Sequence, residues 1–458
     1  MLNVDQKTST CIILSAGAGK RMRADNDSIS HKILSVIGEI SLYRRTLLSL
    51  RSIGITNVII VLGYKSKLLQ KQITSERCPN IKVSYIECKD WEKGNGISLL
   101  SAEKAINSNE FFLLMGDHWI HPEIFSEMLN YKDKFANFLA VDTNLNQIHD
   151  LSNATKIALK DGQTILSASK NLTHFQAVDC GLFFLKKSIY KDLKENIQSG
   201  NCSVTGLINK LAQKNLIHAV PIGNLPWENI NTPSALNIAK KKFWTSLQGK
   251  NDGLVSRFLN RNISRYITTF ALKLKMSPTQ MSIIAFLVAI ISSLGFVTGH
   301  LFIGGVCAQF SSILDGSDGE IARASFSQSQ FGSVLDQYLD RFADVIIIGG
   351  AGIYLLSNDT NLISILFVSL ALVLAPMSFV FKMIFKSIYN IDWDKMQGDK
   401  YAKFAFGTRD ARLFFILIGG IFKLILVSLI LITISSLMLL FLRLINVFIF
   451  TRSKKRIA

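Results

Sequence analysis

The uneven distribution of apolar residues constrains the fold of this chain more than any other feature of its sequence. Hydrophobic residues make up 49% of the 458 residues. Before about residue 275 they occur in short runs interrupted by charges. After it they form runs long enough to cross a bilayer, which takes about 20 apolar residues in a helix. We therefore predict a soluble domain at residues 1–240 and a transmembrane domain at residues 277–458, joined by a connector at residues 241–276.

The net charge of +18 is compatible with either nucleic acid or a membrane surface as a partner. Many cations flank the apolar segments, at Arg257, Arg261, Arg265, Lys273, Lys275, Arg452, Lys454, Lys455 and Arg456. Cations in such places are typical of the cytosolic side of a membrane protein. The charge therefore favours a lipid bilayer as the partner, and no nucleic acid is expected.

Residues 10–240 alternate short apolar runs with helical patterns. Six runs indicate strands, at residues 10–14, 58–62, 83–87, 111–115, 138–141 and 181–184. Helices are expected between them, for example at 41–52 and 97–106. This alternation predicts an α/β domain with a Rossmann-like mixed sheet, mostly parallel and covered by helices on both faces.

The connector combines basic residues with an apolar stripe formed by Leu254, Phe258, Ile263, Tyr266, Phe270 and Leu274. This pattern predicts an amphipathic helix that lies on the membrane, and a surface helix packed on the soluble domain is the alternative. An all-α domain of six transmembrane helices is expected after it, at about 280–299, 301–322, 332–356, 361–386, 411–432 and 434–450. Six spans place both termini on one side, and the flanking cations make that side the cytoplasmic face of the cell (inner) membrane.

Four aspartates lie within the second and third of these segments. Asp315 and Asp318 are three residues apart, and Asp336 and Asp340 are four apart, so each pair shares one face of its helix. A short turn near 325–330 makes the two helices antiparallel, and the four carboxylates can converge. Since clustered buried carboxylates repel one another, they predict two divalent cations, Mg²⁺ or Mn²⁺, which prefer oxygen ligands. Aspartates paired with arginines for packing are the alternative.

The spacing of segment 315–340 resembles the signature of the CDP-alcohol phosphotransferase family, and the resemblance covers about residues 254–450. It implies that Asp315, Asp318 and Asp336 bind the metals, and that Asp340 shares the metal site and acts as the base that deprotonates an acceptor hydroxyl. The nucleotide of a CDP-alcohol would be held at Gly319, Ala322, Arg323 and Gly332, three of which are small enough to leave room for it. The resemblance also implies a homodimer.

A second polar segment, at residues 407–412, precedes the fifth predicted span and resembles the arginine-bearing motif of the same family. Arg409 and Arg412 are expected to clamp the phosphate of an acceptor substrate bidentately. Anchoring of the helix end at the cytosolic membrane surface is the alternative.

A glycine-rich loop follows the first predicted strand, with Ala16, Gly17 and Gly19 and the cations Lys20 and Arg21. Such a loop lets backbone N–H groups approach phosphates, although it is neither a P-loop nor a GxGxxG motif. Lys32 and Asp117, which ends a predicted strand, come later in the chain. This series resembles the sugar-phosphate nucleotidyltransferase family and implies that Asp117 holds a catalytic Mg²⁺.

Segments 94–100, 117–118, 150–156 and 177–181 narrow this resemblance to inositol-1-phosphate cytidylyltransferases, over about residues 10–240. That enzyme also occurs fused to a CDP-alcohol phosphotransferase. The resemblance implies one or two Mg²⁺ or Mn²⁺ ions, with catalytic roles for Lys32 and Arg21 and an inositol phosphate bound near Lys156 and Asp179. It implies that CTP is held by Ala16, Gly17, Gly19, Arg21 and Gly94.

Two departures from that family concern the phosphate and metal sites. His31 stands where the family has proline before the lysine, and Asn229 and Asn231 stand where it has two aspartates. Asn231 thus takes the place of a second metal ligand. An amide oxygen can ligate Mg²⁺ but contributes no charge, so weaker metal binding is expected.

Together these patterns predict a bifunctional membrane enzyme. Its soluble domain would make CDP-inositol from CTP and inositol 1-phosphate, and its membrane domain would transfer phosphoinositol to a second inositol 1-phosphate with release of CMP. The alternative is a phospholipid synthase that uses CDP-diacylglycerol and carries an inactive nucleotidyltransferase-like domain, which Asn229 and Asn231 favour. A membrane scaffold or sensor that binds cytidine nucleotides is a third possibility, and the complete set of four aspartates opposes it.

Overall fold

The computed structural model describes residues 10–23, 31–249, 252–391, 393 and 407–455. The chain divides into two compact units, with the division between Ser246 and Leu247. We call them the soluble unit and the helical unit and consider each by itself.

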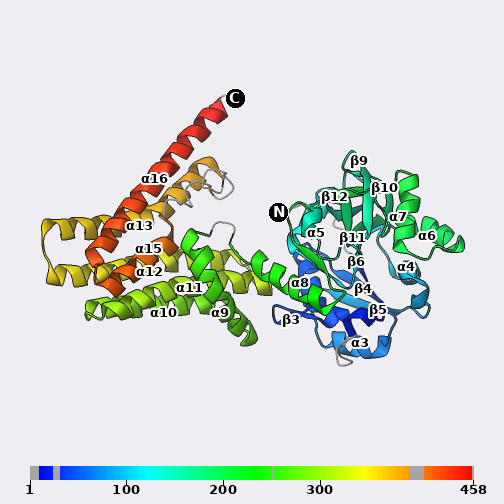
Figure 1. Cartoon of the computed structure of the whole chain (residues 1–458), viewed down its shortest axis with the longest axis horizontal. Helices are drawn as coiled ribbons and strands as arrows, with labels where there is room; N and C mark the ends of the chain where they lie inside the picture. The colour runs from blue at the N-terminus through cyan, green and yellow to red at the C-terminus, as the bar shows by residue number, and fades with distance from the viewer. Residues whose placement is uncertain (1–9, 24–30, 250–251, 392, 394–406, 456–458) are drawn as a thin grey trace. The chain divides into compact units, whose positions relative to one another are not determined.

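The soluble unit is built on a nine-stranded sheet with the order β5-β4-β1-β6-β11-β8-β12-β10-β9 (Figure 1). Its strands are β1 Thr10–Ser15, β4 Asn57–Leu62, β5 Lys82–Glu87, β6 Glu110–Met115, β8 Phe138–Asp142, β9 Lys156–Lys160, β10 Thr164–Ser169, β11 Ala177–Lys186 and β12 His218–Pro221. Two-stranded sheets pair β2 Val36–Ile37 with β3 Ile40–Ser41, and β7 His118–Ile120 with β13 Trp227–Asn229. All six predicted strands are present.

The large sheet is mixed, as predicted, but it is less parallel than expected. Strands β5, β4, β1 and β6 are parallel, but β11 runs antiparallel to its neighbours β6 and β8. Strands β9 and β10 are also antiparallel, because the loop of residues 161–163 between them is too short for the crossover helix that parallel neighbours require.

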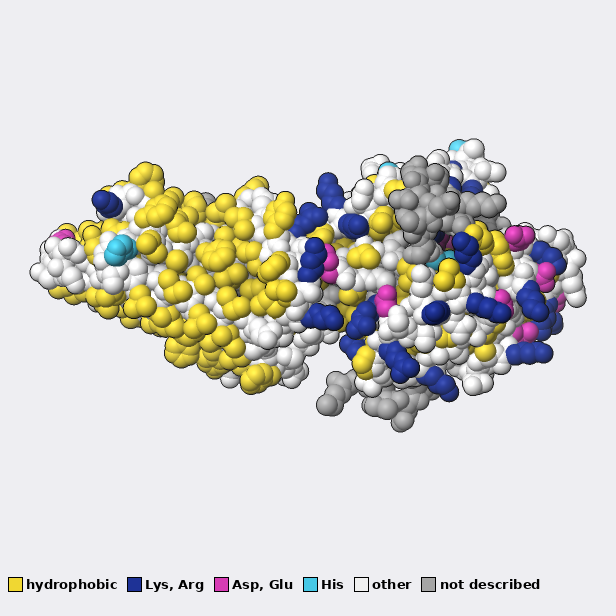
Figure 2. All heavy atoms as spheres, turned by 90° about the horizontal axis from the view of Figure 1, so that it is seen from below, with side chains coloured by type: hydrophobic (Ala, Val, Ile, Leu, Met, Phe, Trp, Pro, Cys, Tyr) yellow, Lys and Arg dark blue, Asp and Glu magenta, His cyan; other side chains and the backbone are white. Residues whose placement is uncertain are grey.

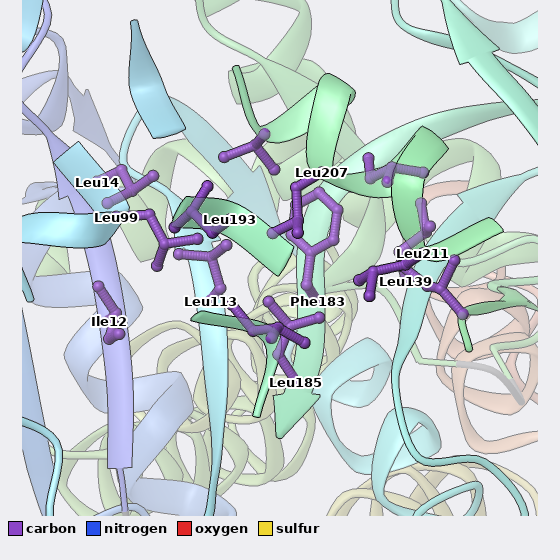
Figure 3. Close-up of a cluster of buried hydrophobic side chains, with 14 of the residues drawn as sticks. Ile12, Leu14, Leu99, Leu113, Leu139, Phe183, Leu185, Leu193, Leu207 and Leu211 are labelled. Carbon is purple, nitrogen blue, oxygen red and sulfur yellow. The ribbon is translucent and has the colours of Figure 1, made fainter. Parts of the chain in front are cut away.

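Helices cover both faces of this sheet. The α-helices of this unit within the described residues are α1 Lys20–Arg23, α2 Leu42–Ser52, α3 Ser66–Thr74, α4 Asn95–Ser101, α5 Pro122–Leu129, α6 Ile189–Gln198, α7 Val204–Gln213 and α8 Pro233–Ser246. On one face, side chains from α4, α6 and α7, such as Leu99, Leu193 and Leu207, pack against the strands (Figure 3). On the other face, Phe112 of β6 meets Phe125 of α5. The predicted helix at 97–106 ends earlier, at Ser101, and a 3₁₀ turn, Glu103–Ala105, follows it.

The helical unit contains α9 Arg261–Lys273, α10 Pro278–Val297, α11 Leu301–Ser325, α12 Gln330–Asn358, α13 Leu362–Tyr389, α15 Arg409–Phe422 and α16 Ile425–Lys455 (Figure 1). Among the described residues, three of its helices are long and apolar enough to cross a membrane: α10, α13 and α16. Figure 2 shows hydrophobic side chains over the visible face of this unit. On α10 the exposed apolar residues recur at Ile283, Leu287, Ile291 and Leu294, which is one face of a helix.

The boundary between the last two predicted spans was wrong. The expected helix at 411–432 ends at Phe422, and α16 begins at Ile425. Lys423 adopts a left-handed conformation with φ 59° that terminates α15. Gly419 and Gly420 bring this helix end against Ser428 of α16 and the Leu301 carbonyl of α11. With 14 residues, α15 is too short to span the hydrocarbon layer unaided.

Helix α9 buries its polar face and exposes its apolar one. Its buried residues are Arg261, Ser264, Thr268 and Ala271. Phe258, in the preceding π-helical turn Ser256–Asn260, is 76% exposed, and Tyr266 and Phe270 of α9 are 78% and 64% exposed. An exposed apolar stripe of this kind is expected where a connector helix lies on a lipid surface. Arg261, counted among the membrane-flanking cations, is instead buried.

Candidate active sites

Carboxylates of the aspartate segment meet at facing turns of α11 and α12. Oxygen atoms of Asp315, Asp318 and Asp336 all lie within 4.8 Å of one another. The two helices approach as predicted, because α11 ends at Ser325 and α12 begins at Gln330 after a short turn. Asp340 lies one helical turn beyond Asp336 and is outside this group of three. The set of acidic oxygens has the chemistry of a site for hard divalent cations.

A serine that the sequence did not single out orients one of these carboxylates. Ser282 of α10 is 7% exposed and donates a hydrogen bond of 2.5 Å from Oγ to Oδ2 of Asp318. Partners of this kind fix which oxygen of a ligating carboxylate remains available to a metal. No motif in the sequence places Ser282 there, since the contact comes from a third helix.

Two cavities lie on either side of the carboxylate group, and Ser333 and Asp336 line both. One, of about 410 Å³, is lined by the four residues expected to hold a nucleotide: Gly319, Ala322, Arg323 and Gly332. The other, of about 470 Å³, is lined by Asp315 and by six cationic side chains: Arg261, Arg341, Lys382, Arg409, Arg412 and Arg443. We call these the small-residue cavity and the cationic cavity.

Arg409 makes contact with the carboxylates directly. Its Nη1 atom lies 2.7 Å from Oδ2 of Asp315 and 3.1 Å from Oδ1 of Asp340. Its Nε donates to Oδ1 of Asp344 at 3.0 Å. One guanidinium therefore neutralises part of the charge of two predicted metal-site residues while a third aspartate fixes its orientation.

Asp344 is a fifth aspartate that the sequence analysis missed. It lies one turn beyond Asp340 on α12 and is fully buried. Besides Arg409 it accepts a hydrogen bond from Arg412, and Arg341 lies 3.6 Å away. The four-residue spacing from Asp336 through Asp340 to Asp344 was the available signal. Arg412 is 2% exposed and is engaged by Asp344 and the Gly407 carbonyl, so its contact with an acceptor phosphate stays a prediction.

The soluble unit carries a cavity of about 410 Å³ at one end of its strands. Among the predicted residues, Arg21, Asp117, Asp179 and Asn231 line it. Lys32 reaches its edge by donating a hydrogen bond from Nζ to Oδ2 of Asp117 at 3.0 Å, and it also contacts Oδ1 of Asn231. Four site residues far apart in the sequence are thereby brought together.

Asp117 is held strongly in its ionised form. Burial alone would raise its pKa, but the hydrogen bond from His118 at 2.9 Å and the charge of Lys32 outweigh burial and place the pKa well below its usual range. Asp117 and Asn231 together offer one carboxylate and one amide. This donor set fits a single Mg²⁺ weakly, because it brings only one negative charge and Lys32 already occupies an oxygen of each residue.

Asp179 lines the same cavity, but its pKa is shifted in the opposite direction to that of Asp117. Burial raises the pKa of its carboxyl to about 6, although the backbone N–H of Gly181 donates to it at 2.7 Å. Near-neutral pKa values in a cavity are typical of functional positions. The position is compatible with the expected contact to an alcohol phosphate.

The remaining predicted residues of the soluble unit lie outside the cavity lining. Gly19 has φ 64° and its Cα lies under the Lys32 side chain, whereas a side chain at Gly94 would meet the Cys202 carbonyl at 2.4 Å. Ala16 is buried and accepts from the Tyr64 N–H, and Gly17 is exposed. Lys156 donates to the carbonyl of Lys170. The roles of these residues toward CTP and inositol phosphate therefore stay predictions.

Comparisons with known proteins match the two units separately. Residues 11–149 match the MobA-like NTP transferase domain, and residues 275–450 match the CDP-alcohol phosphatidyltransferase family. These matches and the two sets of sites define a transferase that joins a nucleotidyltransferase-like unit to a CDP-alcohol phosphotransferase unit. With its three apolar helices, the chain is a membrane protein.

Relatives extend along most of the chain. A bifunctional IPC transferase and DIPP synthase from Aquifex aeolicus is 29% identical over 421 residues, which cover 89% of this chain and 91% of that protein. A protein of the same name from Rubrobacter xylanophilus is 30% identical over 74% of this chain and 76% of its own length. The chain belongs to this family of bifunctional IPC transferase and DIPP synthase proteins. Among solved structures, the inositol-1-phosphate CTP transferase from T. maritima aligns with TM-score 0.46 and 22% identity, over 51% of this chain and 96% of that one.

Proposed function

We propose that the chain catalyses two consecutive reactions, in which the soluble unit makes CDP-inositol and the helical unit consumes it. The observation that carries this proposal is the group of three carboxylates in the shared wall of two cavities of different character. The small-residue cavity suits the nucleotide of the donor. The cationic cavity suits an acceptor that is itself a phosphate ester, such as inositol 1-phosphate.

The second reaction is a phosphoryl transfer between two alcohols. A hydroxyl oxygen of the acceptor attacks the donor phosphorus that carries inositol, the bond from that phosphorus to the CMP oxygen breaks, and the hydroxyl proton passes to Asp340. Asp315, Asp318 and Asp336 would hold two Mg²⁺ or Mn²⁺ ions. Such ions, when bound, neutralise the charge that develops on the attacking and leaving oxygens. Arg409 contributes a fixed positive charge beside Asp340.

The first reaction takes place in the soluble unit under this proposal. A phosphate oxygen of inositol 1-phosphate attacks the α-phosphorus of CTP, a new P–O bond forms, and pyrophosphate leaves. Arg21 and Lys32 neutralise phosphate charge, and Asp179 accepts hydrogen bonds from inositol hydroxyls. Catalysis would rest mainly on positioning and charge neutralisation.

We also propose how the chain is arranged in the membrane. We infer that the six helices α10, α11, α12, α13, α15 and α16 lie in the bilayer, with the soluble unit and both termini in the cytoplasm. The apolar residues of α9 would lie in the membrane surface, flanked by Arg257, Arg265 and Lys273. A homodimer is expected from the resemblance to the phosphotransferase family.

One observation favours the second candidate, a phospholipid synthase with a silent soluble unit. Lys32 lies between Asp117 and Asn231 and competes with any metal there. Pyrophosphate release from CTP and inositol 1-phosphate by the full-length protein distinguishes the two candidates. Its absence, together with transfer from CDP-diacylglycerol, would favour the synthase.

Transfer from directly supplied CDP-inositol tests the chemistry of the helical unit alone. With inositol 1-phosphate and Mg²⁺ present, Asp340→Asn is expected to lower CMP release by roughly 10²–10⁴-fold, the range of general-base catalysis. Binding of the CDP-alcohol should be largely retained, since Asp340 does not line the small-residue cavity. Unchanged CMP release would sink the assignment of Asp340 as the base.

A further inference from the structure

The proposed chemistry assigns no step to a buried polar network beside the carboxylates, although one of its members, Arg261, also lines the cationic cavity. Its centre is Glu320 of α11, two residues beyond Asp318 and 3% exposed. Glu320 accepts hydrogen bonds from three residues of one face of α9: Arg261 at 2.8 Å, Ser264 at 2.9 Å and Thr268 at 2.6 Å. Every donor in this set comes from the connector helix.

Arg261 links this network to the backbone between the two aspartates of α11. Its Nη1 atom also donates to the carbonyl of Gly316 at 2.8 Å. Its Nε and Nη2 atoms donate bidentately to Asp252 at 2.7 and 2.9 Å. One guanidinium thus joins Asp252 of the connector, the Glu320 carboxylate and the turn between Asp315 and Asp318.

Two further hydrogen bonds tie the connector to the same region. Arg323 donates from Nε to the carbonyl of Leu247 at 2.7 Å, and the backbone N–H of Ser256 donates to Asp410 at 2.7 Å. The segment from 247 to 268 is therefore bound to α11 on both sides of Asp318. It is also bound to the first turn of α15, which carries Arg409.

We propose that Arg261 and Glu320 are positioning residues, which hold the turn of α11 that carries Asp315 and Asp318 in metal-binding geometry. The turn needs such support because Gly316 and Gly319 lie within it, and glycine is the most flexible residue in a helix. Buried ion pairs add little net stability compared with apolar packing, whereas a fully satisfied polar network specifies geometry. This inference rests on the proposed metal-dependent transfer.

The test compares full-length variants supplied with CDP-inositol and inositol 1-phosphate over a range of Mg²⁺ concentrations. Glu320→Gln keeps most of the side-chain volume and removes the negative charge. Arg261→Lys keeps the positive charge and replaces the planar guanidinium, with its several donors, by a single ammonium group. Residues that orient metal ligands typically affect metal affinity about 10–100-fold. We expect the Mg²⁺ concentration for half-maximal CMP release to rise on the order of tenfold, with a much smaller change of the rate at saturating Mg²⁺.

The matched control is Gln309→Met. Gln309 is 5% exposed and donates to Asn260, so it belongs to the same contact between α11 and the connector but lies farther from the aspartates. Direct binding of Mn²⁺ gives a readout that does not depend on turnover. Binding at the proposed site is the part of the Mn²⁺ binding signal that Asp315→Asn removes. Glu320→Gln should weaken this component and Gln309→Met should leave it unchanged.

Each outcome separates the inference from the proposed function. Wild-type protein without Mg²⁺-dependent CMP release would contradict the proposed function, and the Mn²⁺ titration would then decide the inference. Equal Mg²⁺ and Mn²⁺ responses in wild type, Glu320→Gln and Gln309→Met would overturn the inference. If Glu320→Gln does not fold, Thr268→Val removes one hydrogen bond to Glu320, and unchanged Mn²⁺ binding in that variant would overturn it equally.

Discussion

Asp344 balances the positive charge of two arginines beside the carboxylate group, although no motif of the sequence includes it. Its carboxylate binds Arg409 and Arg412, and Arg409 in turn contacts Asp315 and Asp340. We expect Asp344→Asn to free Arg409 from its position and to lower the rate of transfer from CDP-inositol by roughly tenfold to a hundredfold. Asp359→Asn, at the far end of α12, should retain the wild-type rate. Equal rates for both variants would contradict the role given to Asp344.

Asp179 and Asp150 line the same cavity but respond to pH with opposite sign. The pKa of Asp179 is raised by burial from 3.8 to about 6, so its contribution to stability is present at low pH and is lost as the pH rises through 6. Asp179→Asn should therefore raise the thermal midpoint of the soluble unit by several degrees at pH 8 and change it little at pH 4. Thermal unfolding of the full-length variant at the two pH values measures this difference.

Asp150→Asn is the matched comparison. Burial would raise the pKa of Asp150, but hydrogen bonds from Asn153 and Ser152 keep it below its ordinary value. Its stabilising contribution is present at neutral pH, so this variant should lose stability at pH 8 where Asp179→Asn gains it. A gain, or no change, in both variants at pH 8 would contradict the electrostatic assignment.

At the scale of elements, close approach of helices decides where α15 ends. A side chain at Gly420 would meet the Leu301 carbonyl at 2.4 Å, whereas a side chain at Gly349 of α12 would meet nothing within 4 Å. We expect Gly420→Ala to destabilise the helical unit by ~1–3 kcal/mol, as overpacking usually does. Gly349→Ala should be neutral or stabilising, because alanine favours helices. Thermal unfolding in detergent compares the two, and equal midpoints would refute the close contact.

The same contact explains why sequence patterns located four predicted spans well and misplaced the last boundary. Helices α10 to α13 are separated by polar or turn-forming residues, which hydropathy detects. Only one charged residue, Lys423, interrupts the apolar run in which this turn lies, and the packing of Gly419 and Gly420 against other helices is what locates the turn. The antiparallel direction of β11 escaped prediction for a related reason, since pairing direction depends on which strands become neighbours.

The sequence likewise predicted some contacts of the candidate sites and not others. Spacing along a helix was sufficient to bring Asp315, Asp318 and Asp336 together. Ser282 and Glu320 depend on contacts between helices, and periodicity carries no information about them. In the soluble unit, the sequence indicated Lys32, Asp117 and Asn231 separately, but their mutual contacts appear only in the folded structure.

At the scale of the whole molecule, one chain joins a unit that would make a CDP-alcohol to a unit that would consume it. Linking two such sites raises the effective concentration of the intermediate. Because the sites are covalently linked, we expect the same protein to use the CDP-inositol that it forms from CTP, without an added donor. Such use requires both sites to be active.

Product analysis by mass spectrometry tests whether both units are active. Purified full-length protein would receive CTP, Mg²⁺ and inositol 1-phosphate, and a parallel reaction would start from CDP-inositol and inositol 1-phosphate. We predict the same phosphorylated di-inositol product in both reactions, with pyrophosphate and CMP released in the first and CMP alone in the second. Product from CDP-inositol only would contradict an active soluble unit, and the absence of product from both reactions would contradict the proposed bifunctional enzyme.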